Sequence, residues 1–101
     1  MMIQEIPLTA DNQRFSVSIN KTTYSMRILW RGNCWVLDLY NSSGEPLILG
    51  VPLVSGTNLL EQHQHLQLGF ALAVACDNPQ QEYPTQDDLG SASHLYIVTE
   101  Q

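Results

Sequence analysis

Hydrophobic and polar residues alternate along most of the first half of the chain, which is the pattern of half-buried β-strands. The apolar members of three successive runs are Phe15, Val17 and Ile19, then Tyr24, Met26, Ile28 and Trp30, and then Trp35, Leu37 and Leu39. Gly32-Asn33 separates the second run from the third. This dipeptide predicts a two-residue type II′ hairpin turn, because glycine readily adopts the positive φ that the first central position requires.

The predicted turn fixes which residues face each other across the hairpin. It places Trp30 opposite Trp35, Ile28 opposite Leu37, Met26 opposite Leu39, and Arg27 opposite Asp38. The apolar pairs then share one face and the charged pair lies on the other, so two independent patterns favour the same register. A loop of even length around Asn20-Lys21 would put the first apolar run on the same face, which gives a three-stranded meander.

The alternation is less regular in the second half of the chain. Residues Leu47 to Val54 form a mostly apolar run interrupted by Gly50 and Pro52, which predicts a bent or bulged strand near a sheet edge. Asn58 followed by Glu61 has the spacing of a helix capping box and predicts one or two helical turns before Leu66.

Two further strands are expected towards the C-terminus. Leu66 to Cys76 has bulky residues at even positions and mostly alanine at odd ones, which favours a strand with one bulky and one nearly bare face. Residues 77–88 form a polar loop in which Asp87 and Asp88 are expected to be solvated, and Leu95 to Thr99 form the last strand. Six or seven short strands and one short helix predict a single all-β domain over residues 1–101, a small antiparallel barrel or sandwich.

Charge narrows the range of partners. The chain has ten acidic and four basic side chains, a formal charge of −6, and all four bases (Arg14, Lys21, Arg27 and Arg31) precede residue 32. Nucleic acid is therefore not an expected partner, since affinity for phosphate backbones comes from clustered Lys and Arg. No secretory signal or membrane-spanning stretch is recognised, so we expect synthesis in the cytoplasm, with Cys34 and Cys76 as reduced thiols.

Candidate chemistry is sparse. His63, His65 and His94, with Cys34 or Cys76, could supply metal ligands, but no third ligand stands at a supporting interval, which favours solvated histidines. No GxSxG elbow and no cysteine in a cationic setting indicates a nucleophile. We therefore predict no catalytic residue, no metal and no cofactor.

The face opposite the core is more informative. Its residues are Leu29, Val36 and Tyr40 among Arg27, Arg31 and Asp38, an apolar patch with flanking charges that is typical of a protein contact. These six residues are the predicted partner-binding site. The small face of Ala71, Ala73 and Ala75 would also allow close approach of another backbone. A second sheet of the same chain could equally cover either face.

Several short motifs in order carry a family resemblance. They are Asn12-Gln13-Arg14-Phe15, Arg27 with Trp30-Arg31, Trp35-Val36-Leu37-Asp38, Gly50-Val51-Pro52-Leu53-Val54-Ser55-Gly56, Asn58-Leu59-Leu60, Asp88-Leu89-Gly90 and His94-Leu95-Tyr96. Together they resemble the baseplate plug family of contractile-tailed phages of the cyanophage type. The pairs Cys34 and Cys76, and His63 and His65, are not features that we associate with this family.

The resemblance implies a structural subunit without chemistry of its own. Such a subunit would lie at the centre of the phage tail baseplate, docked on hub and spike proteins near the end of the tube, in several copies around the tail axis. It would be found in the virion, and in the cytoplasm of the bacterial host before assembly, whether a phage or a prophage encodes it. The acidic C-terminal two-thirds would then face basic surfaces of the hub.

Two other functions remain open from the residues alone. One is a small β-barrel that binds a sugar or an apolar ligand through Trp30, Trp35 and Tyr24, although the register makes the tryptophans better candidates for the core. The other is a metal-dependent hydrolase that uses His63, His65 and His94.

Overall fold

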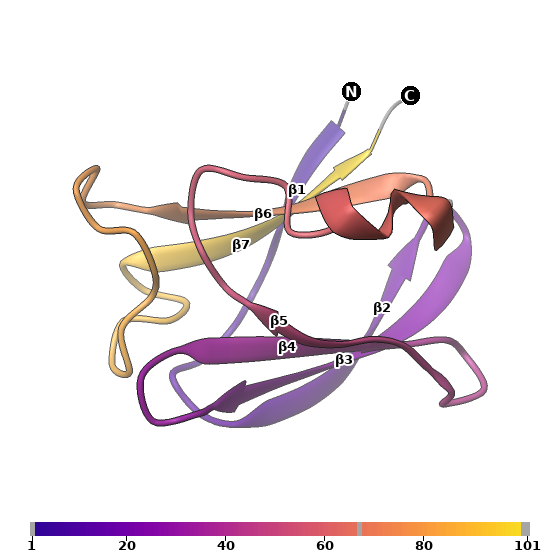
Figure 1. Cartoon of the computed structure of the whole chain (residues 1–101), viewed down its shortest axis with the longest axis horizontal. Coiled ribbons are helices and arrows are strands. Elements are labelled where there is room, and N and C mark those ends of the chain that lie inside the picture. The colour runs from indigo at the N-terminus through magenta and orange to yellow at the C-terminus, as the bar shows by residue number, and fades with distance from the viewer. Residues whose placement is uncertain (1, 67, 100–101) are drawn as a thin grey trace.

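Two antiparallel sheets pack face to face in the computed structural model, which describes residues 2–66 and 68–99 and all of their side chains except those of residues 64–66 (Figure 1). One sheet has the strand order β1-β7-β6, with β1 at Met2–Ile6, β6 at Phe70–Cys76 and β7 at Ser93–Thr99. The other has the order β2-β3-β4-β5, with β2 at Gln13–Ile19, β3 at Thr22–Trp30, β4 at Trp35–Tyr40 and β5 at Pro46–Pro52. The predicted all-β class is confirmed, in the form of a sandwich.

The predicted hairpin register is confirmed. Trp30 pairs with Trp35, Ile28 with Leu37, Met26 with Leu39, and Arg27 with Asp38. Gly32 has a φ of +93°, as the first central position of a type II′ turn requires. The meander is confirmed as well, because Asn20 and Lys21 form a two-residue turn that places Phe15 opposite Met26. Both turn residues have positive φ, which is the conformation of a type I′ hairpin.

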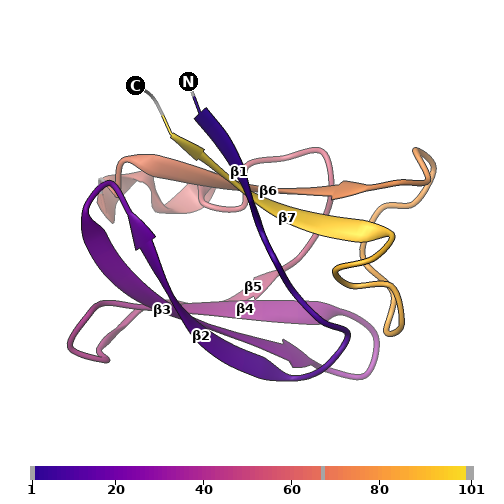
Figure 2. The same cartoon turned by 180° about the vertical axis from the view of Figure 1, so that it is seen from behind.

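The core lies between the inner faces of the two sheets. Met26, Leu37 and Leu39 of one sheet and Leu72 and Leu95 of the other are fully buried in a single cluster. Figure 2 shows the two layers from behind, with β1 and β7 crossing above the four-stranded sheet. Because the sheets meet through these faces, the opposite face of each sheet points away from the core.

Strand β5 confirms the predicted bent strand near an edge. Its register with β4 shifts between Leu37 and Leu39 and again before Tyr40, and the strand carries proline at both ends. A bulge and prolines are the features with which natural sheets interrupt an edge.

The one or two helical turns predicted between β5 and β6 are present as 3₁₀ turns, but the segment differs from the prediction in its cap and its end. The 3₁₀ segment η1, at Glu61–Leu66, consists of two short turns joined by a kink at His63, and it begins three residues after Asn58. Asn58 does not form a capping box, since its Oδ1 accepts hydrogen bonds from the main-chain N–H groups of Leu60 (3.0 Å) and Leu72 (3.3 Å). The predicted strand start at Leu66 is also wrong, because η1 extends to that residue and pairing with β7 begins only at Phe70.

Strand β1 was not predicted. Four of its five residues are exposed, so the strand has no apolar alternation to mark it. Its position depends on pairing with β7, from Met2 opposite Thr99 to Ile6 opposite Leu95. This pairing is a long-range contact that local patterns do not encode.

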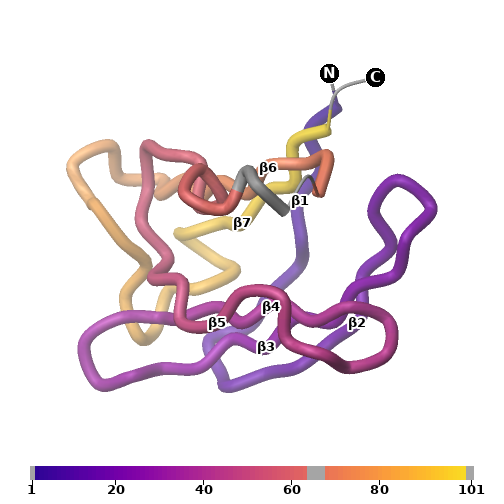
Figure 3. The backbone as a smooth tube through the Cα atoms, turned by 45° about the vertical axis from the view of Figure 1, so that its right-hand side comes forward, coloured from indigo at the N-terminus to yellow at the C-terminus, as the bar shows by residue number. Residues whose placement is uncertain are grey.

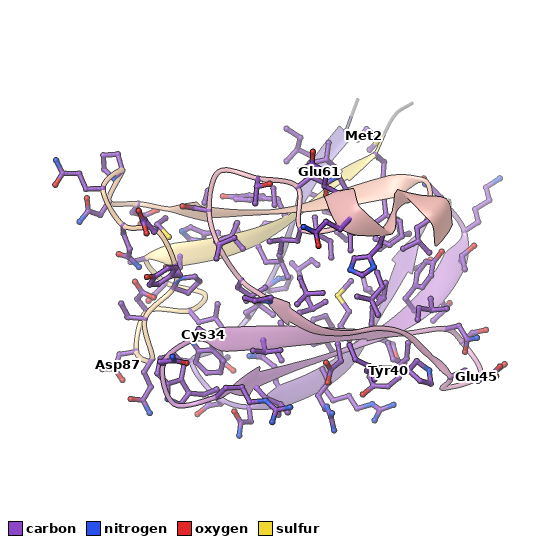
Figure 4. All side chains as sticks on the ribbon, in the orientation of Figure 1. Met2, Cys34, Tyr40, Glu45, Glu61 and Asp87 are labelled. Atoms are coloured by element: carbon purple, nitrogen blue, oxygen red, sulfur yellow. The ribbon has the colours of Figure 1, made fainter. Side chains whose placement is uncertain are left out.

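The polar loop after β6 is more ordered than predicted. Asp87 is exposed (Figure 4), but Asp88 accepts hydrogen bonds from the Thr85 N–H (2.7 Å) and the Gln81 side-chain amide (2.8 Å). Burial alone would raise the pKa of Asp88, but the hydrogen bonds from Gln81, Ser93 and Thr85 outweigh it and the net shift is downward. The prediction of a solvated charge is therefore wrong for Asp88, which organises the loop. Among the described residues, no helix is long and apolar enough to cross a membrane.

Candidate functional site

The six predicted partner-binding residues lie together on the outer face of the β2-β3-β4-β5 sheet. Arg27 and Leu29 come from β3, with Arg31 directly after it, and Val36, Asp38 and Tyr40 come from β4. Arg27 faces Asp38 and Leu29 faces Val36 across the two strands. All of them have the opposite parity to the core residues, so the second sheet of the chain does not cover this face. We call these six residues, together with Arg14, the outer face.

Asp38 is the centre of the polar contacts on the outer face. It is 3% exposed and its Oδ2 accepts hydrogen bonds from Arg27 Nη2 (2.8 Å) and Nε (3.1 Å), while its Oδ1 accepts one from the Gly50 N–H (2.8 Å). Desolvation would raise the pKa of this carboxyl, but the Gly50 and Arg27 hydrogen bonds and the charges of Arg27 and Arg31 hold it below its usual range. The carboxylate therefore joins β3, β4 and the bulge in β5.

Arg14 belongs to the outer face but was not among the predicted residues. Its guanidinium carbon lies 4.7 Å from the centre of the Tyr40 ring, a cation–π contact, and Arg14 pairs with Arg27 across β2 and β3. The parity of β2 could have revealed it, because Phe15 was placed on the core face and its neighbour must point the other way. The contact helps to explain why Tyr40 is only 8% exposed.

The exposed part of the outer face is therefore smaller than the sequence suggested. Asp38 and Tyr40 are buried beneath their arginine partners, whereas Leu29 and Val36 are half-buried and Arg31 is exposed. Three of the chain's four basic side chains gather here, and Figure 4 labels Tyr40 on the side of the sheet away from the second layer. A surface of this kind can contact a partner that is partly apolar and carries acidic groups.

The alanine face lies on the β1-β7-β6 sheet, on the side that points away from the core. Leu72 and Val74 of β6 point into the core, so Ala71, Ala73 and Ala75 point away from it, and they lie opposite Val98, Tyr96 and His94 of β7. Neither the alanine face nor the outer face is therefore covered by the opposite sheet of the sandwich.

The residues of the alternative ligand site lie inside the sandwich. Trp35 is 1% exposed and Tyr24 is 8% exposed. The rings of Trp30 and Trp35 pack edge to face at 5.3 Å, and Tyr24 packs in the same way against Phe70 at 5.3 Å. These rings contact each other and contribute to the core, which favours the interpretation of the tryptophans as core residues.

The histidines do not form a common centre. His63 lies in η1 and His94 in β7, and the side chain of His65 lies outside the described residues. His94 Nδ1 lies 2.8 Å from Glu5 Oε2 and His94 Nε2 lies 3.1 Å from Asp77 Oδ1, so the two carboxylates bind opposite sides of the ring and do not converge on one point. Among the described side chains, which leave out those of residues 64–66, no three potential ligands are placed to hold a metal ion, and both cysteines are free thiols.

Stability should depend on pH through His94. A neutral imidazole has one N–H, so binding both carboxylates requires the protonated ring, and the hydrogen bond to Glu5 is the largest of the effects that raise the pKa of His94. Because this pKa lies above the unfolded value of 6.5, the stabilisation is complete below pH 6.5 and is lost as the pH rises through the folded-state pKa. We expect a loss of up to about 1 kcal/mol in wild type, measured by urea unfolding at a series of pH values.

The matched variant for this measurement is His94→Gln, which keeps a hydrogen-bonding side chain that does not titrate. The difference in unfolding free energy between wild type and His94→Gln should shrink above pH 6.5. A difference that stays constant across neutral and alkaline pH would contradict the assignment of the charge to His94.

A comparison with protein families identifies one match over nearly the whole chain. Residues 3–100 match the family model described as cyanophage baseplate Pam3 plug gp18. None of the curated proteins matches the sequence. The family match confirms the resemblance carried by the motifs, and it supports a structural role in the phage tail baseplate, in association with other baseplate components. The chain belongs to the cyanophage baseplate plug family.

Proposed function

We propose that this chain is a plug subunit that docks on the hub and spike proteins at the end of the tail tube through its outer face, in several copies around the tail axis. The family match supports a baseplate role, and the position of the basic residues beside half-buried apolar ones supports this choice of surface. Before assembly, the subunit resides in the cytoplasm of the bacterial host.

The observation that carries the choice of surface is the concentration of positive charge in an otherwise acidic chain. Arg14, Arg27 and Arg31 share the outer face, whereas the chain as a whole has a formal charge of −6. Arg14 and Arg27 are held in place by Tyr40 and Asp38, respectively, and Arg31 is exposed at the edge of the patch. A fixed basic patch beside half-buried Leu29 and Val36 suits an acidic, partly apolar surface on the hub. In the same proposal, the acidic side chains outside the outer face contact basic surfaces of neighbouring baseplate proteins.

Reversing the exposed charge on this face should weaken docking. For Arg31→Glu, we expect about tenfold weaker retention of co-expressed hub and spike proteins on the tagged plug, because like charges then oppose each other. Raising the salt from about 0.15 M to about 1 M should weaken wild-type retention in the same assay, since screening shortens the range of exposed charges.

The matched control is Lys21→Glu, which makes the same charge change in the β2-β3 turn, outside the outer face. It should retain the hub proteins as wild type does. Equal retention by both variants would remove the outer face from the proposal, and retention of wild type that does not change at high salt would indicate an apolar contact instead.

A further inference from the structure

The edge strands of the two sheets differ in how their outer sides are protected from pairing with a further strand. Among the described strands, β1, β6, β2 and β5 lie at the edges. The β5 edge is interrupted by its prolines and its bulge. The β6 edge is covered by the preceding segment of the chain, where Ser55 bridges to Val74, Leu59 N–H donates to Leu72 C=O (2.8 Å), and Asn58 Oδ1 accepts from Leu72 N–H.

The β2 edge has none of these protections. Its seven residues contain no proline, no glycine and no bulge, and no described strand pairs with its outer side. Ile19 and Thr22 flank the two-residue turn and form a hydrogen-bonded pair, and such pairs alternate along an antiparallel hairpin. The main-chain N–H and C=O groups of Arg14, Ser16 and Ser18 therefore point away from β3, towards the open side.

This open edge borders a groove. A cavity of about 240 Å³ lies between β1 and β2, with apolar contributions from Phe15, Val17 and Ile97 and polar ones from Gln4, Glu5 and Ser16. Figure 3 shows the backbones of β1 and β2 diverging from each other. Phe15 and Val17 are only partly buried, so apolar side chains remain accessible next to unpaired main-chain groups.

We propose that this groove accepts an extended segment of a partner protein, which adds to β2 as a further strand. Main-chain groups of the segment pair with Arg14, Ser16 and Ser18, and its alternate apolar side chains enter the groove against Phe15 and Val17. This interaction is independent of docking through the outer face.

Charge specifies the occupant further. Glu5 is the charged residue in the lining of the groove. Its Oε2 is bound to His94, whereas its Oε1 has no partner among the described residues. A segment with a lysine or arginine beside Glu5 therefore fits the groove better than an acidic one, and the net charge of the chain favours the same choice.

Amide hydrogen exchange with a defined peptide tests the proposal. The probe is a synthetic peptide as long as β2, seven residues, that alternates threonine and valine and carries a central lysine. Titrated into the full isotope-labelled chain up to millimolar concentration, it should slow exchange at the Arg14, Ser16 and Ser18 amides and leave the β5 amides unchanged. The same peptide with a central glutamate should bind about fivefold more weakly, and one with a central proline should give no protection.

Two variants complete the test. Glu5→Gln should bind the lysine peptide about fivefold more weakly, whereas Glu45→Gln, in the exposed β4-β5 turn, should bind it as wild type does. Absence of protection at Ser16 and Ser18, or equal protection by the proline peptide, would overturn the proposal. Protection that appears without peptide and grows with protein concentration would also overturn it, because it would assign the edge to a second copy of the chain.

Discussion

Replacing Trp35 with alanine should lower the free energy of unfolding by about 4 kcal/mol, the largest loss that we expect from a single substitution in this chain. The side chain is 1% exposed, and its ring packs edge to face against Trp30. Its Nε1 also donates a hydrogen bond to the Thr85 C=O (2.8 Å), which ties the loop after β6 to the core. The variant therefore loses buried apolar area, an aromatic pair and a loop anchor together. Urea unfolding of the purified chain measures the loss.

Two further variants separate these contributions. Trp35→Phe keeps an aromatic ring but loses the hydrogen bond to Thr85. We therefore expect the lost hydrogen bond to cost about 1 kcal/mol of unfolding free energy, in addition to the cost of the smaller buried ring. Trp30→Ala removes the same side chain from a partly exposed position and should cost roughly half as much as Trp35→Ala. Equal losses for Trp30→Ala and Trp35→Ala would show that burial does not decide the effect.

The meander could be predicted from the sequence because local signals agree there. The two-residue turns at Gly32-Asn33 and Asn20-Lys21 set both registers, and the alternation from Phe15 to Leu39 assigns each residue to a face. A shift by one residue would have exposed the apolar set, so few other arrangements were possible. The family resemblance followed from motifs spread between Asn12 and Tyr96 and was confirmed over residues 3–100.

The β1-β7-β6 sheet was harder to predict, because the contacts that position its strands join segments far apart in the sequence. Exposed β1 is defined by its partner β7, and the start of β6 is displaced because Leu66 belongs to η1. The Asn58 side chain, whose spacing to Glu61 predicts a helix cap, accepts hydrogen bonds from the N–H of Leu60 and from that of Leu72, fourteen positions away. Such contacts appear only when distant segments are brought together.

The candidate site was predicted in position but not in exposure. Strand parity was sufficient to gather Arg27, Leu29, Val36 and Asp38 on one face, and the register paired the charges correctly. The burial of Asp38 depends on Gly50 in the β5 bulge, and that of Tyr40 on Arg14 in β2. These neighbours come from strands on either side of the hairpin, so the pattern of the hairpin alone could not reveal them.

Replacing Asp38 with alanine should cost about 2 to 3 kcal/mol of unfolding free energy. The substitution leaves the Arg27 guanidinium and the Gly50 N–H without their acceptor, and it removes the link between β3, β4 and the β5 bulge. The loss falls below the roughly 3 to 5 kcal/mol typical of a fully buried ion pair, because the Arg27 side chain is 39% exposed and regains solvation. Asp87→Ala, an exposed carboxylate in the loop, should change stability by less than about 0.5 kcal/mol in the same urea experiment.

The pH dependence of a conservative variant tests whether the charge of Asp38 is the cause of this stabilisation. The folded-state pKa of Asp38 lies below the unfolded value of 3.8, so its stabilisation is present above that value and is lost as the pH falls through the folded-state pKa. Asp38→Asn keeps the shape and an acceptor for Gly50, but it does not titrate. The stability difference between wild type and Asp38→Asn should therefore be constant near neutral pH and shrink in acid below about pH 4. A difference that persists unchanged in acid would attribute the effect to side-chain geometry, and the carboxylate charge would then have no part in holding the outer face together.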